Sequence, residues 1–204
     1  MLESERIKLF DPKREYLNLG ISDGGAVYSI IPVFWESSAG AFSMKTPDVF
    51  IAPEDLSDKE IMDRVFSLTV HGLYVYAPLE DYSFIAKFPE LWDIHIERAE
   101  GLTNLDFLSE MHDCAMIFLA SASLSDIDVI RRVKEADKGI VQAFRYVCLY
   151  DCNIEKIPDF SNTKCRFTEL IIWSRAENSE SDRERFSAIS ATTKKYFVIK
   201  PKNE

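Results

Sequence analysis

Apolar residues recur with one fixed spacing in two segments of the chain. In the first segment the apolar positions are Cys114, Ile117, Leu119, Ala122, Leu124, Ile127 and Ile130. In the second segment they are Phe144, Val147, Leu149, Cys152, Ile154, Ile157 and Phe160. Both segments follow the pattern L-x-x-L-x-L-x-x-N/C-x-L-x-x-I-x-x-L, in which a short strand is followed by a helical or 3₁₀ return arm. The spacing therefore predicts two consecutive copies of one structural repeat.

The same spacing continues in both directions along the chain. Successive copies begin at residues 70, 91, 114, 144 and 167, and the copy that begins at 91 carries one inserted residue at Glu100-Gly101. Phe197 and Ile199 predict a last strand. A single repeat cannot bury its own apolar face, so repeats must stack before a continuous core exists. We therefore expect about five irregular repeats, stacked on one another, over residues 66–204.

Two phrases in these repeats resemble a known family. Residues 102–108 read LTNLDFL and residues 124–130 read LSDIDVI, which are similar to phrases of the short bacterial leucine-rich repeats found in internalins. The resemblance covers about residues 66–200. It implies an α/β fold, a right-handed leucine-rich-repeat solenoid with a parallel sheet on its concave side, and a role in binding a protein or peptide. The asparagine position of the family holds Ala99, Ala122 and Cys152, so we expect fewer buried polar anchors and a less regular curve.

The first 65 residues lie outside the repeats and are predicted to form a β-rich N-terminal cap. Residues 14–21 and 26–31 have strand-like patterns, and the turn residues between them predict a hairpin. A further short apolar run covers residues 49–51. The stretch from Ser57 to Glu60 reads as a capping box that opens a short helix over residues 58–66, with Ile61, Val65 and Phe66 on one face. Such a segment would cover the first apolar layer of the solenoid.

The repeat register also predicts which side chains line the concave sheet. Alternate residues of a strand point to opposite faces, so the residues between the inward leucines share one surface. The residues that we expect to bind a partner there are Tyr74, Tyr76, Trp92, Asp93, His95, Glu97, Phe118, Tyr146, Tyr150, Asp151, Glu169 and Trp173. Large aromatic side chains are enriched at interface hot spots, and acidic neighbours favour basic partners. Two other interpretations stay open: these aromatics pack against the N-terminal segment, or against a second copy of the chain.

Composition narrows the class of partner. The formal net charge of −10 disfavours binding to nucleic acid or to an anionic membrane and favours basic partners. We therefore expect a protein or peptide partner, a homo-oligomer, or a neutralising, immunity-type complex with a basic protein. The N-terminus has no secretory pattern, no segment reaches the ~18 apolar residues that cross a bilayer, and the cysteines suggest no disulfide framework. These features predict a cytoplasmic location.

Catalysis is not expected from this arrangement. The register places His95 and Cys148 two strands apart, which separates their backbones by about 10 Å. A nucleophile and its base need about 2.6–3.2 Å between heavy atoms. Asp93 and Glu97 would lie about 13 Å apart along one strand, too far for the carboxylate pair of a glycosidase. The sequence offers no metal-ligand cluster and no cofactor motif, so we predict no catalytic residues, no metal and no cofactor.

Overall fold

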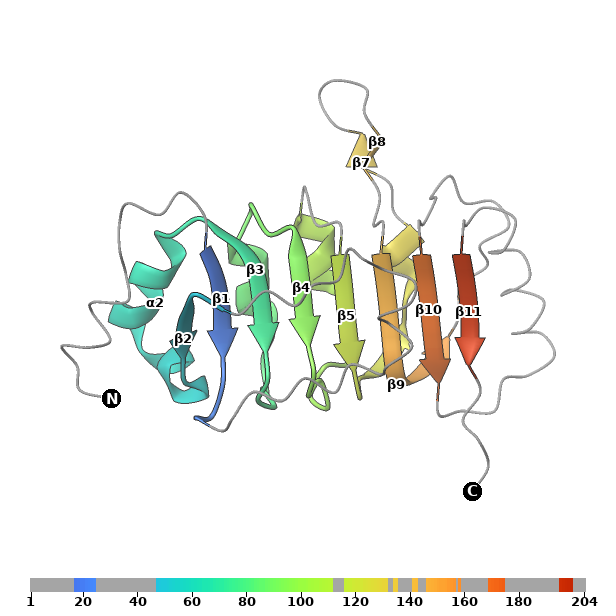
Figure 1. The fold of residues 1–204 in the computed structure, drawn as a ribbon, viewed down its shortest axis with the longest axis horizontal. Helices are drawn as coiled ribbons and strands as arrows, with labels where there is room; N and C mark the ends of the chain where they lie inside the picture. The colour runs from blue at the N-terminus through green and yellow to red at the C-terminus, as the bar shows by residue number, and fades with distance from the viewer. Residues whose placement is uncertain are drawn as a thin grey trace.

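The structure is a computed structural model that describes residues 17–24, 47–111, 116–131, 134–135, 141–142, 146–156, 158, 169–174 and 195–199 of the chain. It is an α/β fold in which one long parallel sheet dominates and the helices are few and short (Figure 1). Among the described residues, no helix has the length and apolar character needed to cross a membrane.

The main sheet has the strand order β11-β10-β9-β5-β4-β3-β1-β2, and each strand is parallel to its neighbours. From β3 onwards its strands follow one another in chain order, and all six start near the positions that the repeat spacing predicts. The strands are β1 (Leu17–Ile21), β2 (Val49–Ile51), β3 (Val70–Val75), β4 (Asp93–Ile96), β5 (Met116–Ala120), β6 (Ser123–Asp126), β7 (Lys134–Glu135), β8 (Val141–Gln142), β9 (Tyr146–Lys156), β10 (Glu169–Ser174) and β11 (Lys195–Ile199). The short strands β7 and β8 form a separate antiparallel pair.

One face of the sheet builds the main core. In β3, β4, β5, β9 and β10 the predicted inward residues align in two rows across neighbouring strands, and each residue of these rows is fully buried or nearly so. The predicted inward residues Cys114, Phe144, Ile157, Phe160 and Phe167 lie outside the described residues. The rows are Leu73, Ile94, Ile117, Val147 and Leu170, and Val75, Ile96, Leu119, Leu149 and Ile172. The inward half of the predicted register is therefore confirmed.

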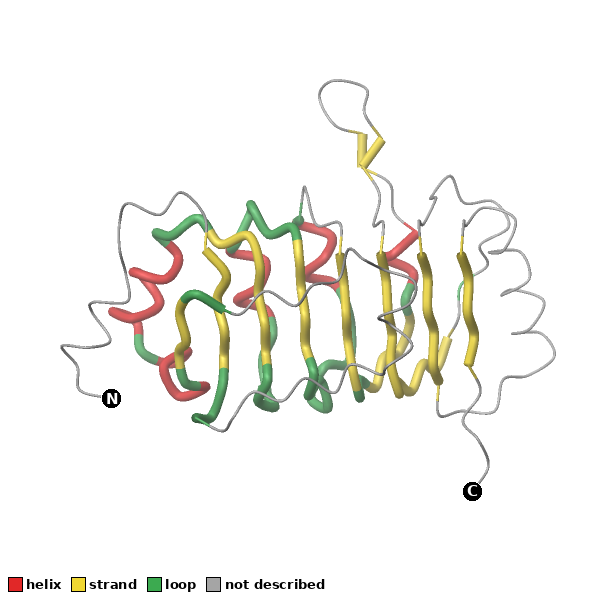
Figure 2. The backbone as a smooth tube through the Cα atoms, viewed as in Figure 1, coloured by secondary structure: helices red, strands yellow, loops and turns green. Residues whose placement is uncertain are grey.

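Short helical segments return the chain along this core face (Figure 2). They are the 3₁₀ helices η2 (Pro53–Ser57), η3 (Ser83–Lys87), η4 (Asp106–Glu110) and η5 (Asp128–Arg131), and the α-helix α2 (Lys59–Phe66). We call η3, η4 and η5 the return arms. Each return arm contributes a buried residue to the main core, namely Ile85, Leu108 and Ile130.

Each return arm begins with the same polar contact. A side-chain oxygen accepts a hydrogen bond from the backbone N–H two residues later, at 2.8 Å from Asp81, 3.1 Å from Asn104 and 2.9 Å from Asp126. This contact satisfies a backbone donor that the short helix leaves without an internal partner. It explains why Asn or Asp stands in the phrases LTNLDFL and LSDIDVI.

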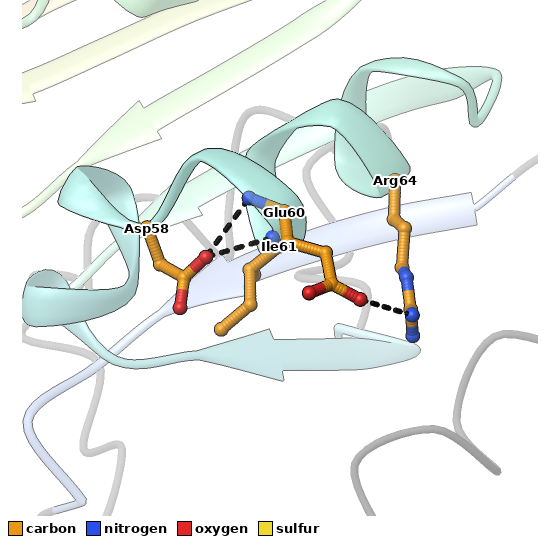
Figure 3. A network of polar contacts seen from close by, with 4 residues as sticks. All are labelled: Asp58, Glu60, Ile61 and Arg64. Carbon is orange, nitrogen blue, oxygen red and sulfur yellow. Dashed lines mark hydrogen bonds and ion pairs between the residues drawn. The ribbon is translucent and has the colours of Figure 1, made fainter.

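The predicted helix near residue 58 is confirmed, with a different cap and buried face. Asp58, and not Ser57, is the N-cap: its carboxylate accepts from the N–H groups of Glu60 at 2.9 Å and Ile61 at 3.2 Å (Figure 3). Because the helix begins at Lys59, its fully buried residues are Met62 and Val65, whereas the expected Ile61 and Phe66 are only partly buried. On the exposed side, Arg64 donates to Glu60 at 2.6 Å.

The predicted N-terminal hairpin is wrong in its first arm. Strand β1 lies between β2 and β3 and is parallel to both, so Leu19 aligns with Val49 on one side and with Leu73 on the other. A strand has only two hydrogen-bonding edges, and both edges of β1 are therefore occupied by other strands. The expected second arm, residues 26–31, lies outside the described residues. Within the described part of the chain, β1 and β2 extend the parallel sheet beyond the first repeat.

Candidate functional site

The second face of the sheet, called here the outer face, has its own small apolar cluster. Phe118, Ala120 and Cys148 form this cluster with Tyr150 packed against it, and none of the described helices contributes to it. The described helices pack into the other cluster. The outer face is where the sequence places the predicted binding residues.

The middle row of the outer face is buried, which corrects the prediction for three of its residues. Tyr74, His95, Phe118 and Cys148 align across β3, β4, β5 and β9 and are only 1%, 5%, 4% and 0% exposed. The ring of His95 stacks on Phe118 with centroids 4.3 Å apart and lies 5.9 Å from the ring of Tyr74. Parallel sheets are commonly covered on both faces. Tyr74, His95 and Phe118 are therefore packing residues in this structure and not exposed anchors.

Other predicted residues border this row and remain accessible. Trp92, immediately before β4, is 42% exposed. As whole residues, Tyr76, Asp93, Glu97, Tyr146, Tyr150 and Asp151 are partly exposed, although the side chain of Glu97 is itself only 8% exposed. Glu169 lies on β10 in register with Tyr146, and Trp173 lies further along β10, but their side chains are outside the described part of the structure. We call Tyr76, Trp92, Asp93, Glu97, Tyr146, Tyr150 and Asp151 the rim.

Polar contacts tie the rim to the buried row. The Tyr74 hydroxyl donates to the Asp93 carboxylate at 2.9 Å, and His95 Nε2 lies 3.0 Å from Glu97 Oε1. Nε2 donates to this oxygen in the tautomer in which it carries the ring hydrogen. The side chains of His95 and Glu97 are only 7% and 8% exposed, so their contact is shielded from water. The two carboxylates are thereby held in fixed positions on β4 and directly after it.

The carboxylates of Glu97 and Asp93 contribute to a raised pKa of Tyr76. Burial, together with the nearby negative charges of Glu97 and Asp93, raises the pKa of Tyr76 to about 12. The pKa of Tyr150 is raised by burial first and then by Asp151 and Cys148. Both tyrosines therefore keep their hydroxyl protons at neutral pH and can donate hydrogen bonds to a partner.

The geometry does not assemble a catalytic pair from the predicted residues. Strand β5 separates His95 from Cys148, and the Phe118 ring stacks directly on His95. In the described part of the chain, His, Cys, Asp and Glu side chains do not gather in groups of three or more that could hold a metal ion. What the rim offers is a set of aromatic surfaces and carboxylates, which suits the binding of cationic and apolar groups.

A cavity that the repeat pattern did not predict lies between return arms η3 and η4. Its volume is about 420 Å³, and its lining includes the carboxylates of Glu80, Asp81 and Asp106 and the apolar Tyr82 and Phe107. Hydrogen bonds from the N–H and hydroxyl of Ser83 lower the pKa of Asp81. Two of the lining residues, Asp81 and Asn104, cap return arms η3 and η4. Because these side chains already serve the turns between strands, we attribute the cavity to those turns.

Comparison of the chain with protein-family models, with curated proteins and with solved structures finds no match. The functional interpretation therefore rests on the rim and on the sheet that positions it.

Proposed function

We propose that this chain is a non-enzymatic binding module that recognises a basic protein or peptide through the rim. The observation that carries the proposal is the exposure of Trp92 immediately before the fixed carboxylate of Asp93, on a strand that a second fixed carboxylate, Glu97, directly follows, beside a tightly packed row. Rigid aromatic side chains contribute large contact areas at little entropic cost, and they dominate many interfaces.

The finer fold assignment belongs to the same proposal. A leucine-rich-repeat solenoid accounts for strands that stack in chain order and for return arms that all open with the same Asx contact. It also accounts for a repeat length that changes without loss of the sheet register, because insertions fall in the segments between strands. Proteins of this architecture present extended surfaces for partners.

Charge favours a basic partner. The chain carries a formal net charge of −10, and the rim contains three carboxylates, those of Asp93, Glu97 and Asp151. Complementary charge accelerates encounter and disfavours acidic competitors. An arginine or lysine of the partner that binds at the rim would contact both an aromatic ring and a carboxylate.

Affinity capture from a lysate of the source cell tests the proposal. The bait proteins are the wild type, a rim variant (Trp92→Ala with Tyr146→Ala), and a control variant (Phe84→Ala) that removes a partly buried aromatic from return arm η3. We expect the wild type and the control to retain the same basic protein and the rim variant to lose it. Equal recovery by all three baits would contradict the proposal, and a wild-type dimer that the rim variant abolishes in size measurements would assign the rim to self-association.

A further inference from the structure

The rim divides into two groups that lie on either side of the buried row of the outer face. The amino-end group lies at the start of β4 and β9 and consists of Trp92, Asp93 and Tyr146. The corner group lies where β3, β4 and β5 end and consists of Tyr76, Glu97, Tyr150 and Asp151. The row between them is Tyr74, His95, Phe118 and Cys148, and each of its residues is at most 5% exposed. In the described part of the outer face, a partner therefore meets accessible rim residues in two separate places.

Each group combines an aromatic ring with one carboxylate that a partner can reach. In the amino-end group, Trp92 is 42% exposed, and the partly exposed Asp93 is held in place by a hydrogen bond from β3 at 2.9 Å. In the corner group, Asp151 is partly exposed. Burial first, and then the negative charge of Asp151, raise the pKa of Tyr150, so this carboxylate lies near the Tyr150 side chain. The Glu97 side chain is only 8% exposed and adds little that a partner can contact. An aromatic ring and a carboxylate together suit one cationic side chain in each group.

The sheet register sets the distance between the two accessible carboxylates. Strand β5 lies between β4 and β9 (Figure 1), and its Met116 aligns with both Asp93 and Tyr146. Strands β4 and β9 are therefore two strand steps, or about 10 Å, apart. Along β9, Asp151 lies beyond Tyr146 by at most about 16 Å. The backbones of Asp93 and Asp151 are therefore about 15–19 Å apart, and one cationic side chain cannot contact both carboxylates.

We infer that the rim recognises a two-point basic motif, in which one cationic side chain of the partner binds at Trp92 and Asp93 and a second binds at Tyr150 and Asp151. This inference rests on the proposed function, because it concerns the same binding surface, and it adds the spacing that the partner must have. Once the first contact forms, the second becomes intramolecular, so a partner with the matching spacing gains affinity from both. A partner whose basic residues form one compact cluster would gain only one contact.

The test uses three fluorescently labelled helical peptides, rich in alanine and glutamine, that have the same composition and two arginines each. The arginines stand at positions i and i+4, i and i+11, or i and i+18, which places them on one helix face about 6, 16 and 27 Å apart. Fluorescence anisotropy measures the affinity of each peptide for the wild-type chain. We expect the peptide with the i, i+11 spacing to bind about fivefold to tenfold more tightly than the other two, because it alone forms both contacts.

Three charge-removing variants locate the two contacts. Asp93→Asn and Asp151→Asn each keep the shape of the side chain, and asparagine also tolerates the left-handed backbone at position 151. Each variant should bind the three peptides with affinities that differ by less than about twofold, because only one ion pair remains. The matched control Asp63→Asn loses the same charge on the exposed side of α2 and should keep the wild-type preference. Unfolding temperatures show that each variant is folded.

The outcomes separate this inference from the proposed function. Equal affinity of the wild type for all three arginine peptides would overturn the two-point motif and leave the proposed function intact. The same conclusion would follow if both rim variants kept the wild-type preference. If the wild type bound none of these peptides more tightly than matched peptides that carry two glutamates, both the motif and the proposed function would be overturned.

Discussion

Two residues show how single positions shape this molecule. Ser121 and Asp151 have φ values of 64° and 52°. Ser121 directly follows Ala120 and Asp151 directly follows Tyr150, and Ala120 and Tyr150 are aligned partners on β5 and β9, so the two residues form neighbouring corners of the chain. A left-handed backbone at a non-glycine residue is uncommon. At these corners the chain leaves the main sheet, and β6 then pairs with the second half of β9. The corner of the repeat is therefore set by backbone conformation and not by a ladder of buried asparagines.

Gly101 is the residue at which the repeat spacing shows an insertion, and the structure explains why glycine stands there. A Cβ atom at this position would clash with the backbone carbonyl oxygen of Leu79. Gly101→Ala should therefore lower the free energy of unfolding by about 1–3 kcal/mol, because neighbouring repeats would be forced apart. Chemical denaturation measures the change, and the exposed neighbour substitution Thr103→Ala should have little effect. Equal stabilities of the two variants would contradict the close approach.

Tyr76 provides a prediction at high pH. Its pKa is raised to about 12, above the ordinary value of 10, by burial and by the carboxylates of Glu97 and Asp93. Its contribution to stability is complete below about pH 10 and is lost as the pH rises from 10 towards 12, because the unfolded chain ionises first. Tyr76→Phe should therefore flatten the loss of stability in this range. Compared with the wild type, ultraviolet titration of the folded Tyr76→Phe variant should no longer show the tyrosine that ionises near pH 12. Ionisation of Tyr76 near 10 would contradict the described surroundings.

At the scale of elements, the sequence predicts the strands well and their environment less well. The positions of β3, β4, β5 and β9 and their inward residues follow from the spacing of the leucines. The direction of strand pairing cannot be predicted in this way, because an apolar run such as residues 17–21 suits a hairpin and a parallel ladder equally. The alternation along β4 likewise shows that His95 faces away from the main core, but it cannot show that His95 is buried on that side.

The Asx contacts at the return arms predict a measurable loss when one is removed. Asn104→Ala deletes the oxygen that accepts from the N–H of Asp106 at 3.1 Å, and should destabilise the protein by about 0.5–2 kcal/mol. The matched control is Asn153→Ala on β9, where the exposed residue contributes its backbone N–H to the ladder and the substitution leaves that bond in place. Denaturation midpoints of the two variants give the comparison. A larger loss at Asn153 would show that the caps do not stabilise the return arms.

At the scale of the whole molecule, stacking of similar units explains both the stability and the proposed role. The repeats bury one continuous core between the sheet and its return arms, and the sheet positions the rim residues, which lie on β4 and β9 or directly beside β3 and β4. The sequence predicts this periodic frame because each unit obeys the same local spacing. It does not predict which outer-face side chains stay exposed, because that depends on contacts between distant parts of the chain.

The most direct test of the central claim is amide hydrogen exchange of the chain with and without the basic partner recovered by affinity capture. Binding at the rim should slow exchange in residues 92–97 and 146–151 and leave the return arms at residues 83–87 and 106–110 unchanged. Protection confined to the return arms, with no change at β4 and β9, would contradict the assignment of the rim as the binding surface.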